Sequence, residues 1–225
     1  GVLATGEIWV RVPESVKINI TGELGPGIMA KDVDLWLCGH LGIMGCGYQV
    51  TEYAGLGVQA MSVQERMTLA NMAAELGAKT GIVAADEKTA KALSEWGAGE
   101  VDLETWQSDP GATYARTVKV DGEKLAPQVA APSSPENAAD VAEHAGTPVA
   151  QAYLGACTGA KVDDLRMAAQ VVKGRKIKPG MRFFVAPSSY RMGEEAAAEG
   201  ILKVFEDAGA EILPSGCGAC IGLGK

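Results

Sequence analysis

Alternating apolar and polar positions mark the first strands of this chain. Two bursts of alternation, at residues 8–12 and 16–20, are separated by Pro13, and this period of two predicts two short strands. The run at residues 80–85 is short and mostly apolar, which is typical of a buried strand. Further extended or apolar runs predict strands at residues 48–53, 117–120, 149–156, 182–186 and 210–213.

Helices are predicted between these strands by apolar spacing and by capping residues. Ser62 and Glu65 form a capping box, so a helix begins there and runs through Leu76. Gly77 suits the position just past the C-terminus of that helix, where a left-handed backbone is common. Further helices are predicted at residues 30–41, 87–96, 162–173 and 193–208.

This order of elements predicts the fold class. Strands that alternate with helices are typical of an α/β protein, and we expect two three-layer α/β/α units with mainly parallel sheets. The first unit is expected to cover residues 1–105 and the second to cover residues 106–225. Prolines and glycines interrupt the pattern between residues 97 and 148, which we interpret as the connection into the second unit.

The composition of the chain limits the classes of binding partner and the cellular location that we expect. The net charge is −8, so we expect neither a nucleic-acid nor an anionic-membrane partner. No apolar run approaches the roughly 20 residues needed to cross a bilayer. The five cysteines are odd in number and irregularly spaced, unlike a secreted disulfide framework, so a reducing cytoplasm is the expected location.

Three of the five cysteines follow predicted strands of the second unit. Cys157 ends its first strand, and Cys217 and Cys220 lie on a glycine-rich loop after its third. The carboxyl ends of parallel strands meet at one edge of a sheet, and the first and third strands of such units are often neighbours, so these thiols can converge. Three thiolates without a fourth suit an iron–sulfur cluster that keeps one metal open to substrate.

Other interpretations of these cysteines fit less well or remain open. A structural zinc site needs four ligands, and a redox dithiol needs its Cys-x-x-Cys at the start of a helix. The spacing of the three cysteines alone is equally consistent with three inert buried thiols and with a cluster. Asn71 and Glu75, four residues apart, share one helix face, which faces either a site or the solvent.

The remaining candidate residues predict no chemistry. His40 and His144 have no serine or cysteine motif keyed to them, so a hydrolytic triad is not expected. A phosphate-binding loop would need a glycine at Ala160. Cys38 and Cys46 are expected to be ordinary buried thiols.

Six blocks of the sequence carry a resemblance to a known family. They include Leu-Gly-Ala-Cys-Thr-Gly and Gly-Cys-Gly-Ala-Cys, and they lie at residues 4–14, 24–32, 65–78, 109–112, 154–159 and 216–220. In their content and order they resemble the aconitase superfamily, in its branch of 3-isopropylmalate dehydratase large subunits and homoaconitases. The chain resembles the middle two α/β domains of that family.

The resemblance implies a cofactor, a reaction and roles for particular residues. It implies that Cys157, Cys217 and Cys220 hold a [4Fe-4S] cluster whose fourth iron is free, with Asn71 beside the cluster and Glu75 near the substrate hydroxyl or an iron-bound water. It implies a hydro-lyase that dehydrates and hydrates, and so isomerises, a 2-hydroxy di- or tricarboxylic acid such as isopropylmalate. The open iron would act as the Lewis acid.

The resemblance also implies partners. In that family the serine that acts as the general base belongs to a swivelling domain, which is a separate small subunit in the dehydratase branch. A small-subunit partner is therefore expected besides the small-molecule hydroxy acid. Gly159 and Ala160 stand where the family usually has polar residues or glycine, which suggests a divergent branch.

Two segments of the family, one upstream and one downstream, are not in this sequence, so the chain alone is expected to have no catalytic activity. The alternative is a binding or regulatory module of the same fold without a cluster, and a dithiol oxidoreductase is the third hypothesis.

Overall fold

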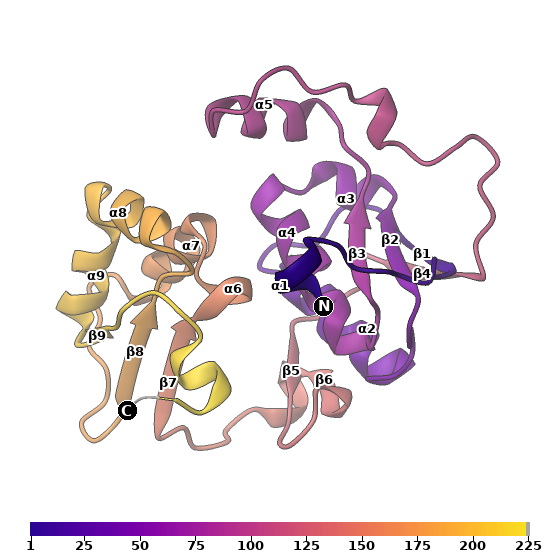
Figure 1. Ribbon diagram of the computed structural model, residues 1–225. Coiled ribbons are helices and arrows are strands. Elements are labelled where there is room, and N and C mark those ends of the chain that lie inside the picture. The colour runs from indigo at the N-terminus through magenta and orange to yellow at the C-terminus, as the bar shows by residue number, and fades with distance from the viewer. Residues whose placement is uncertain (224–225) are drawn as a thin grey trace.

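The computed structural model describes residues 1–223 of the chain. Its first sheet has four parallel strands in the spatial order β3-β2-β1-β4 (Figure 1). β1 therefore lies inside the sheet, and its Ile18 stands opposite Tyr53 of β2 and Val118 of β4. The strands are β1 (Ser15–Thr21), β2 (Val50–Ala54), β3 (Thr80–Val83) and β4 (Arg116–Asp121).

One face of this sheet forms the core of the first unit. Every second residue of β1 is buried there, namely Val16, Ile18 and Ile20. They pack with fully buried leucines of α2 (Ala30–Leu41) and α4 (Val63–Met72). The alternation in this part of the sequence therefore reflects one buried face and one more open face.

The other face of the sheet is polar and is covered by an irregular segment. Glu52 accepts hydrogen bonds from Ser108 at 2.7 Å and from Tyr114 at 2.8 Å. The ammonium of Lys17 lies 4.9 Å from the centre of the Tyr114 ring. The α/β class with parallel sheets is as predicted, but loop rather than helix covers these polar side chains.

Helix α4 begins where its capping box predicts. Ser62 Oγ accepts from the N–H of Glu65 at 3.2 Å, and Glu65 Oε2 accepts from the N–H of Ser62 at 2.9 Å. The α-helix is shorter than predicted, because its continuation, η1 (Ala73–Leu76), is a 3-10 turn. Gly77 ends that turn in the left-handed conformation, with a φ of 75°.

The first sheet extends past the boundary expected at residue 105. β4 lies beyond that residue, yet it pairs with β1 in parallel. Between β3 and β4 the chain passes through α5 (Glu87–Glu95) and η2 (Glu104–Trp106). After β4, the antiparallel pair β5 (Gln128–Ala130) and β6 (Ala138–Asp140) packs against α2.

The second unit contains a parallel sheet in the order β7-β8-β9. Its helices pack around Leu165, Val185 and Phe205. Helix α6 (Ala156–Gly159) leads out of β7 toward α4 of the first unit (Figure 1). The other elements are β7 (Gln151–Gly155), β8 (Arg182–Ala186), β9 (Glu211–Ile212), α7 (Val162–Val172), α8 (Tyr190–Ala198) and α9 (Ile201–Ala208).

Four predictions about these elements are wrong. Residues 8–12 form no strand, and Trp9 is 87% exposed, since no strand lies beside them. The run at residues 80–85 contains the edge strand β3, which is only partly buried. The helix expected at residues 193–208 is split at Gly200, whose φ is 75°. β7 and β9 are not neighbours, because β8 lies between them.

Short helices complete the described part of the chain. They are α1 (Val2–Thr5), α3 (Leu56–Ala60), η3 (Pro135–Asn137), η4 (Val141–His144) and η5 (Gly218–Ile221). None of the helices within residues 1–223 is long and apolar enough to cross a membrane.

Candidate functional site

The five cysteines divide into two groups by exposure. Cys157, Cys217 and Cys220 are exposed free thiols, whereas Cys38 and Cys46 are fully buried, as predicted. Burial raises the pKa of Cys38 to about 12, with further contributions from nearby carboxylates. A thiol with so high a pKa stays protonated at neutral pH, which makes Cys38 a poor nucleophile.

Cys157 lies at the carboxyl end of β7, where the chain turns toward the first unit. The preceding residue, Ala156, is buried and adopts a left-handed φ of 64°, which is uncommon outside glycine. Cys157 Sγ donates to Oδ1 of Asn71 on α4 at 3.3 Å. The structure therefore brings together two of the predicted site residues that are 86 positions apart.

A buried ammonium joins the two units beneath this contact. Lys161 Nζ donates to Thr68 Oγ1 of α4 at 2.6 Å and to the carbonyl oxygen of Cys157 at 3.2 Å. It also forms an ion pair with Asp164 Oδ2 at 3.2 Å, and both side chains are almost fully buried. All three protons of the ammonium thus have acceptors. Lys161 holds the Cys157 turn against the helix that carries Asn71.

The loop of Cys217 and Cys220 crosses back to β7, although β9 and β7 are not adjacent. Tyr153 Oη donates to the carbonyl oxygen of Cys217 at 3.1 Å and lies 3.5 Å from that of Gly216. Burial raises the pKa of Tyr153, and the nearby Cys220 and Cys217 add to this shift. The loop therefore lies beside the strand that leads to Cys157.

A cavity of about 470 Å³ opens between the two units at this place. Cys220 and Thr158 line it from the second unit, and Lys31 lines it from α2 of the first. Most of the remaining wall is apolar, including Met29, Leu154, Met167, Ala168 and Val171. Asp164, which is paired with Lys161, also lines the cavity. A mostly apolar wall that includes Lys31 suits an anion that carries an apolar group.

Glu75 lies in η1, which packs against α2. It is half-buried, and its Oε2 is buried without a hydrogen-bond partner in the described residues. Burial raises the pKa of Glu75, while the positive charge of Lys31 opposes that shift. The carboxyl of Glu75 also acts electrostatically on Asp34 and Cys38 of α2. The helix spacing predicted that Glu75 and Asn71 share one face. Asn71 lies in α4 and Glu75 in the 3-10 turn η1 that follows it, so the two do not belong to one regular α-helix.

Comparison with the sequences of known proteins identifies the family of this chain. A sequence model of the Aconitase family (aconitate hydratase) matches residues 1–148 and residues 142–225. The two matched ranges together cover the whole sequence. The chain belongs to the aconitase family.

Individual relatives agree with this assignment. The 3-isopropylmalate dehydratase large subunit 2 of Archaeoglobus fulgidus is 42% identical over 98% of this chain and 53% of its own length. Large subunit 1 of Methanopyrus kandleri is 42% identical, and large subunit 1 of Pyrococcus furiosus is 40% identical, each with 52% of its own length covered. This aconitase-family chain therefore spans about half the length of the curated relatives it matches.

A solved structure is also similar to this member of the family. The holo-form of aconitase X from Thermococcus kodakaraensis aligns with 91% of this chain and 44% of its own, at 15% identity and a TM-score of 0.49.

The three exposed cysteines of this aconitase-family chain fit an iron–sulfur cluster in their chemistry. Within residues 1–223, no three His, Cys, Asp or Glu side chains lie close enough to share one metal ion. Each cysteine of a [4Fe-4S] cluster binds a different iron, so its thiols stand further apart than the ligands of a single ion. The arrangement therefore does not suit one zinc ion, whose sulfur ligands all lie about 2.3 Å from it.

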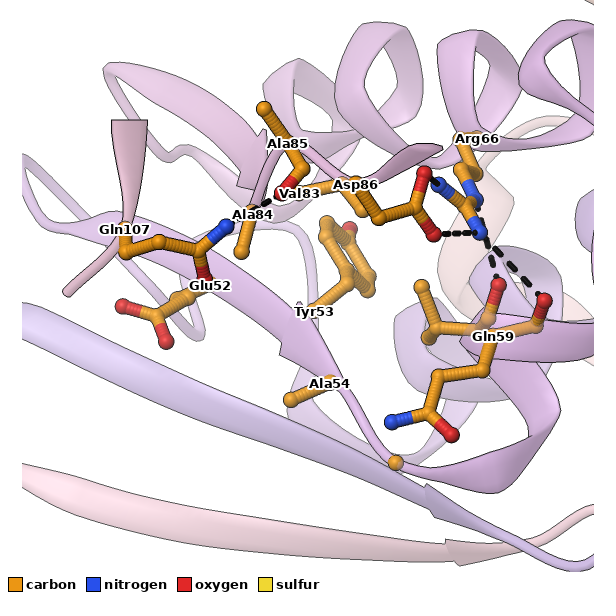
Figure 2. Close-up of a pocket in the computed structure, with 12 residues that line it drawn as sticks. Glu52, Tyr53, Ala54, Gln59, Arg66, Val83, Ala84, Ala85, Asp86 and Gln107 are labelled. Carbon is orange, nitrogen blue, oxygen red and sulfur yellow. Dashed lines mark hydrogen bonds and ion pairs between the residues drawn. The ribbon is translucent and has the colours of Figure 1, made fainter. Parts of the chain in front are cut away.

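A second cavity lies where a parallel sheet commonly binds ligands, outside the carboxyl ends of β2 and β3. Its volume is about 190 Å³. Figure 2 shows Arg66 and Asp86, which both line it, side by side, and two hydrogen bonds of 2.7 Å join them. Arg66 also donates to the carbonyl oxygen of Gln59 at 3.3 Å. Arg66 and Asp86 are thus paired with each other, and Glu52, which also lines this cavity, accepts hydrogen bonds from Ser108 and Tyr114.

Sequence reasoning missed three residues that shape the candidate site of this aconitase-family chain. In the sequence, Lys161 lies in an ordinary loop and Tyr153 in an ordinary strand. Their hydrogen bonds to Thr68 and to Cys217, which are distant in sequence, are known only from the fold. Asp34 is fully buried and accepts from Tyr53 Oη at 2.9 Å. An available signal was its place on the apolar face of α2, one turn before the buried Cys38.

Proposed function

We propose that this chain is a large-subunit segment of an iron–sulfur hydro-lyase that dehydrates and rehydrates a 2-hydroxy di- or tricarboxylic acid such as isopropylmalate. Cys157, Cys217 and Cys220 are the proposed ligands of a [4Fe-4S] cluster. The observation that carries the proposal is the 3.3 Å contact between the Cys157 thiol and the Asn71 amide. Family membership and the names of the large-subunit relatives support it.

A bound cluster would supply a Lewis acid at its open iron, which lowers the barrier to loss of hydroxide. Asn71 is placed to hydrogen-bond the Cys157 sulfur. When that sulfur is a thiolate, the Asn71 amide turns its Nδ2 donors toward it, because a thiolate accepts but does not donate. Hydrogen bonds to ligand sulfurs tune such clusters, so Asn71 both orients and adjusts the site.

Glu75 is the proposed proton carrier of this chain. Its raised pKa favours a carboxyl that still holds a proton closer to neutral pH than an ordinary glutamate does. A protonated Glu75 can donate to the departing hydroxyl and later accept a proton from the returning water. Lys31, which lines the cavity, supplies positive charge for a substrate carboxylate. The apolar wall suits an alkyl substituent on the acid.

The rest of the reaction is assigned to a partner. Relatives named as large subunits imply a small subunit, and we propose that it brings the base that removes the carbon-bound proton. On this proposal the segment alone binds a cluster but does not turn over. We also propose a reducing cytoplasm as its location, since exposed thiols and an oxygen-sensitive cluster need one.

The test is anaerobic reconstitution of the 225-residue chain with iron and sulfide. We expect a brown protein with about four irons per chain, which is the content of a [4Fe-4S] cluster. Cys157→Ala should lose most of the iron and the visible absorption. Cys38→Ala is the matched control, because it removes a buried cysteine that the proposal does not use, and it should load like the wild type.

The outcomes separate the proposal from its alternative. If the wild type and Cys38→Ala both bind no iron, the cluster-less module of the same fold is favoured. Where iron does bind, the full-length large subunit with its small partner is assayed for dehydration. Glu75→Gln should then lower kcat by about 10²- to 10⁴-fold, as loss of a general acid–base group does. An unchanged kcat would remove Glu75 from the mechanism.

A further inference from the structure

The loop that carries Cys217 and Cys220 has few attachments to the rest of the protein. Its own hydrogen bonds are local, from Cys220 N–H to the carbonyl of Cys217 at 2.9 Å and from Leu223 N–H to that of Gly218 at 3.0 Å. In the described part of the chain, hydrogen bonds from residues 216–222 to other segments all involve the hydroxyl of Tyr153. One side chain therefore makes all the recorded hydrogen bonds that link this loop to other described segments.

Tyr153 stands on β7, four residues before Cys157, so it links the two segments that bear the exposed thiols. Its hydroxyl donates to the Cys217 carbonyl at 3.1 Å. The ring lies over Gly155, where even a methyl group would overlap it. A Cβ on Gly218 would stand 3.5 Å from the hydroxyl, so the loop backbone lies directly against the ring end.

We propose that Tyr153 is a positioning residue that docks the Cys217–Cys220 loop beside Cys157 and so holds the three thiols ready for one cluster. This inference rests on the proposed function, because it assigns those thiols to a common site. It goes beyond the proposed function in naming a residue that is not itself a cluster ligand, although its side chain lines the cavity together with Cys220. A tyrosine is suited to this task, since its rigid ring sets the distance and its hydroxyl sets the register of the loop.

The first test needs no iron. Hydrogen exchange of the loop amides, followed by mass spectrometry of peptides covering residues 214–222, is compared in the apo chain for wild type and Tyr153→Phe. Loss of one net hydrogen bond should speed exchange about 2- to 12-fold. Tyr190→Phe is the matched control, because Tyr190 is 76% exposed and makes no hydrogen bond that the structure records through its hydroxyl.

A second variant disturbs the same contact by another route. Gly155 has extended backbone with a φ of −171°, which any residue adopts, so Gly155→Ala strains no torsion. Its methyl group displaces the ring and should loosen the loop at least as much as Tyr153→Phe. Far-UV circular dichroism confirms that each variant is folded.

The third readout is the rate at which reconstituted protein loses iron to a chelator. Faster loop exchange together with faster iron loss in Tyr153→Phe supports the inference. Unchanged exchange overturns it, and so does faster exchange with an unchanged rate of iron loss. If the wild type binds no iron, the proposed function fails. The exchange data then decide alone whether Tyr153 docks the loop.

Discussion

Replacing Lys161 with methionine tests how the two units are joined. The Lys161 ammonium is 3% exposed, and its three acceptors are Thr68 Oγ1, the Cys157 carbonyl and the carboxylate of Asp164. Methionine keeps much of the length and apolar packing of the side chain but removes the charge. Asp164, itself 6% exposed, would remain as a buried carboxylate whose one recorded hydrogen bond within residues 1–223 is from the backbone N–H of residue 161 at 3.0 Å.

The expected cost follows from that geometry. Breaking a buried ion pair by removing one partner costs about 3–5 kcal/mol, because the other charge stays buried without compensation. That is a large share of the roughly 5–15 kcal/mol that stabilises a typical protein. The double variant Lys161→Met with Asp164→Asn should recover part of the loss. The asparagine carbonyl can still accept the capping N–H, while the unpaired charge is gone.

Urea unfolding supplies the measurement. Far-UV circular dichroism follows the whole chain, and tryptophan fluorescence follows the first unit, because the four tryptophans all lie within residues 9–106. Lys173→Met is the matched control, since Lys173 is an exposed lysine at the end of the same helix. If Lys161→Met unfolds within about 0.5 kcal/mol of that control, the buried pair does not hold the junction.

Three further predictions concern buried or paired carboxyls. Burial raises the pKa of Asp34 well above its ordinary value of 3.8, so the folded state holds a proton that the unfolded state releases. Because this release favours unfolding, Asp34 lowers the stability of the fold increasingly as the pH rises above about 4. In urea titrations, Asp34→Asn should therefore gain stability relative to wild type as the pH rises, and a difference in unfolding free energy that is independent of pH would refute this. Tyr53→Phe removes the sole hydrogen-bond partner of that carboxyl in the described residues and should lower the unfolding free energy by about 1–3 kcal/mol. The hydrogen bond from Arg66 lowers the pKa of Asp86 to about 2, so its contribution is complete above about pH 4 and is lost as the pH falls toward 2. The difference in unfolding free energy between wild type and Asp86→Asn should shrink over that range, and an undiminished difference at pH 2 would contradict the assignment.

Local signals predicted most of the elements. The helix at residues 30–41 and the strand at residues 182–186 have the predicted bounds, and the capping box located the start of α4. These features depend on neighbours within a few residues, which a sequence displays directly. Alternation failed at residues 8–12, because a period of two describes extended backbone but supplies no partner strand.

Long-range pairing could not be read in the same way. β4 joins β1 across about a hundred residues, and β8 separates β7 from β9. The structure brings Cys157 into contact with Asn71, and the role of both residues in one site stays a prediction. The residues that produce this convergence were not foreseen. An isolated lysine such as Lys161 has the appearance of a surface residue until the chain is folded. Only then does its ammonium meet Thr68, 93 residues away, besides the nearby Cys157 carbonyl and Asp164.

The position of β1 inside the first sheet has a consequence for synthesis. β1 pairs early with β2, but its other edge stays open until β4 has been made. At about 5–20 residues per second, the stretch between Val83 and Arg116 takes roughly 2–6 s to translate. During that interval the nascent chain presents an unpaired strand edge to its surroundings. Chaperone dependence of expression should therefore be greatest for chains truncated before residue 116, and should fall once β4 is included.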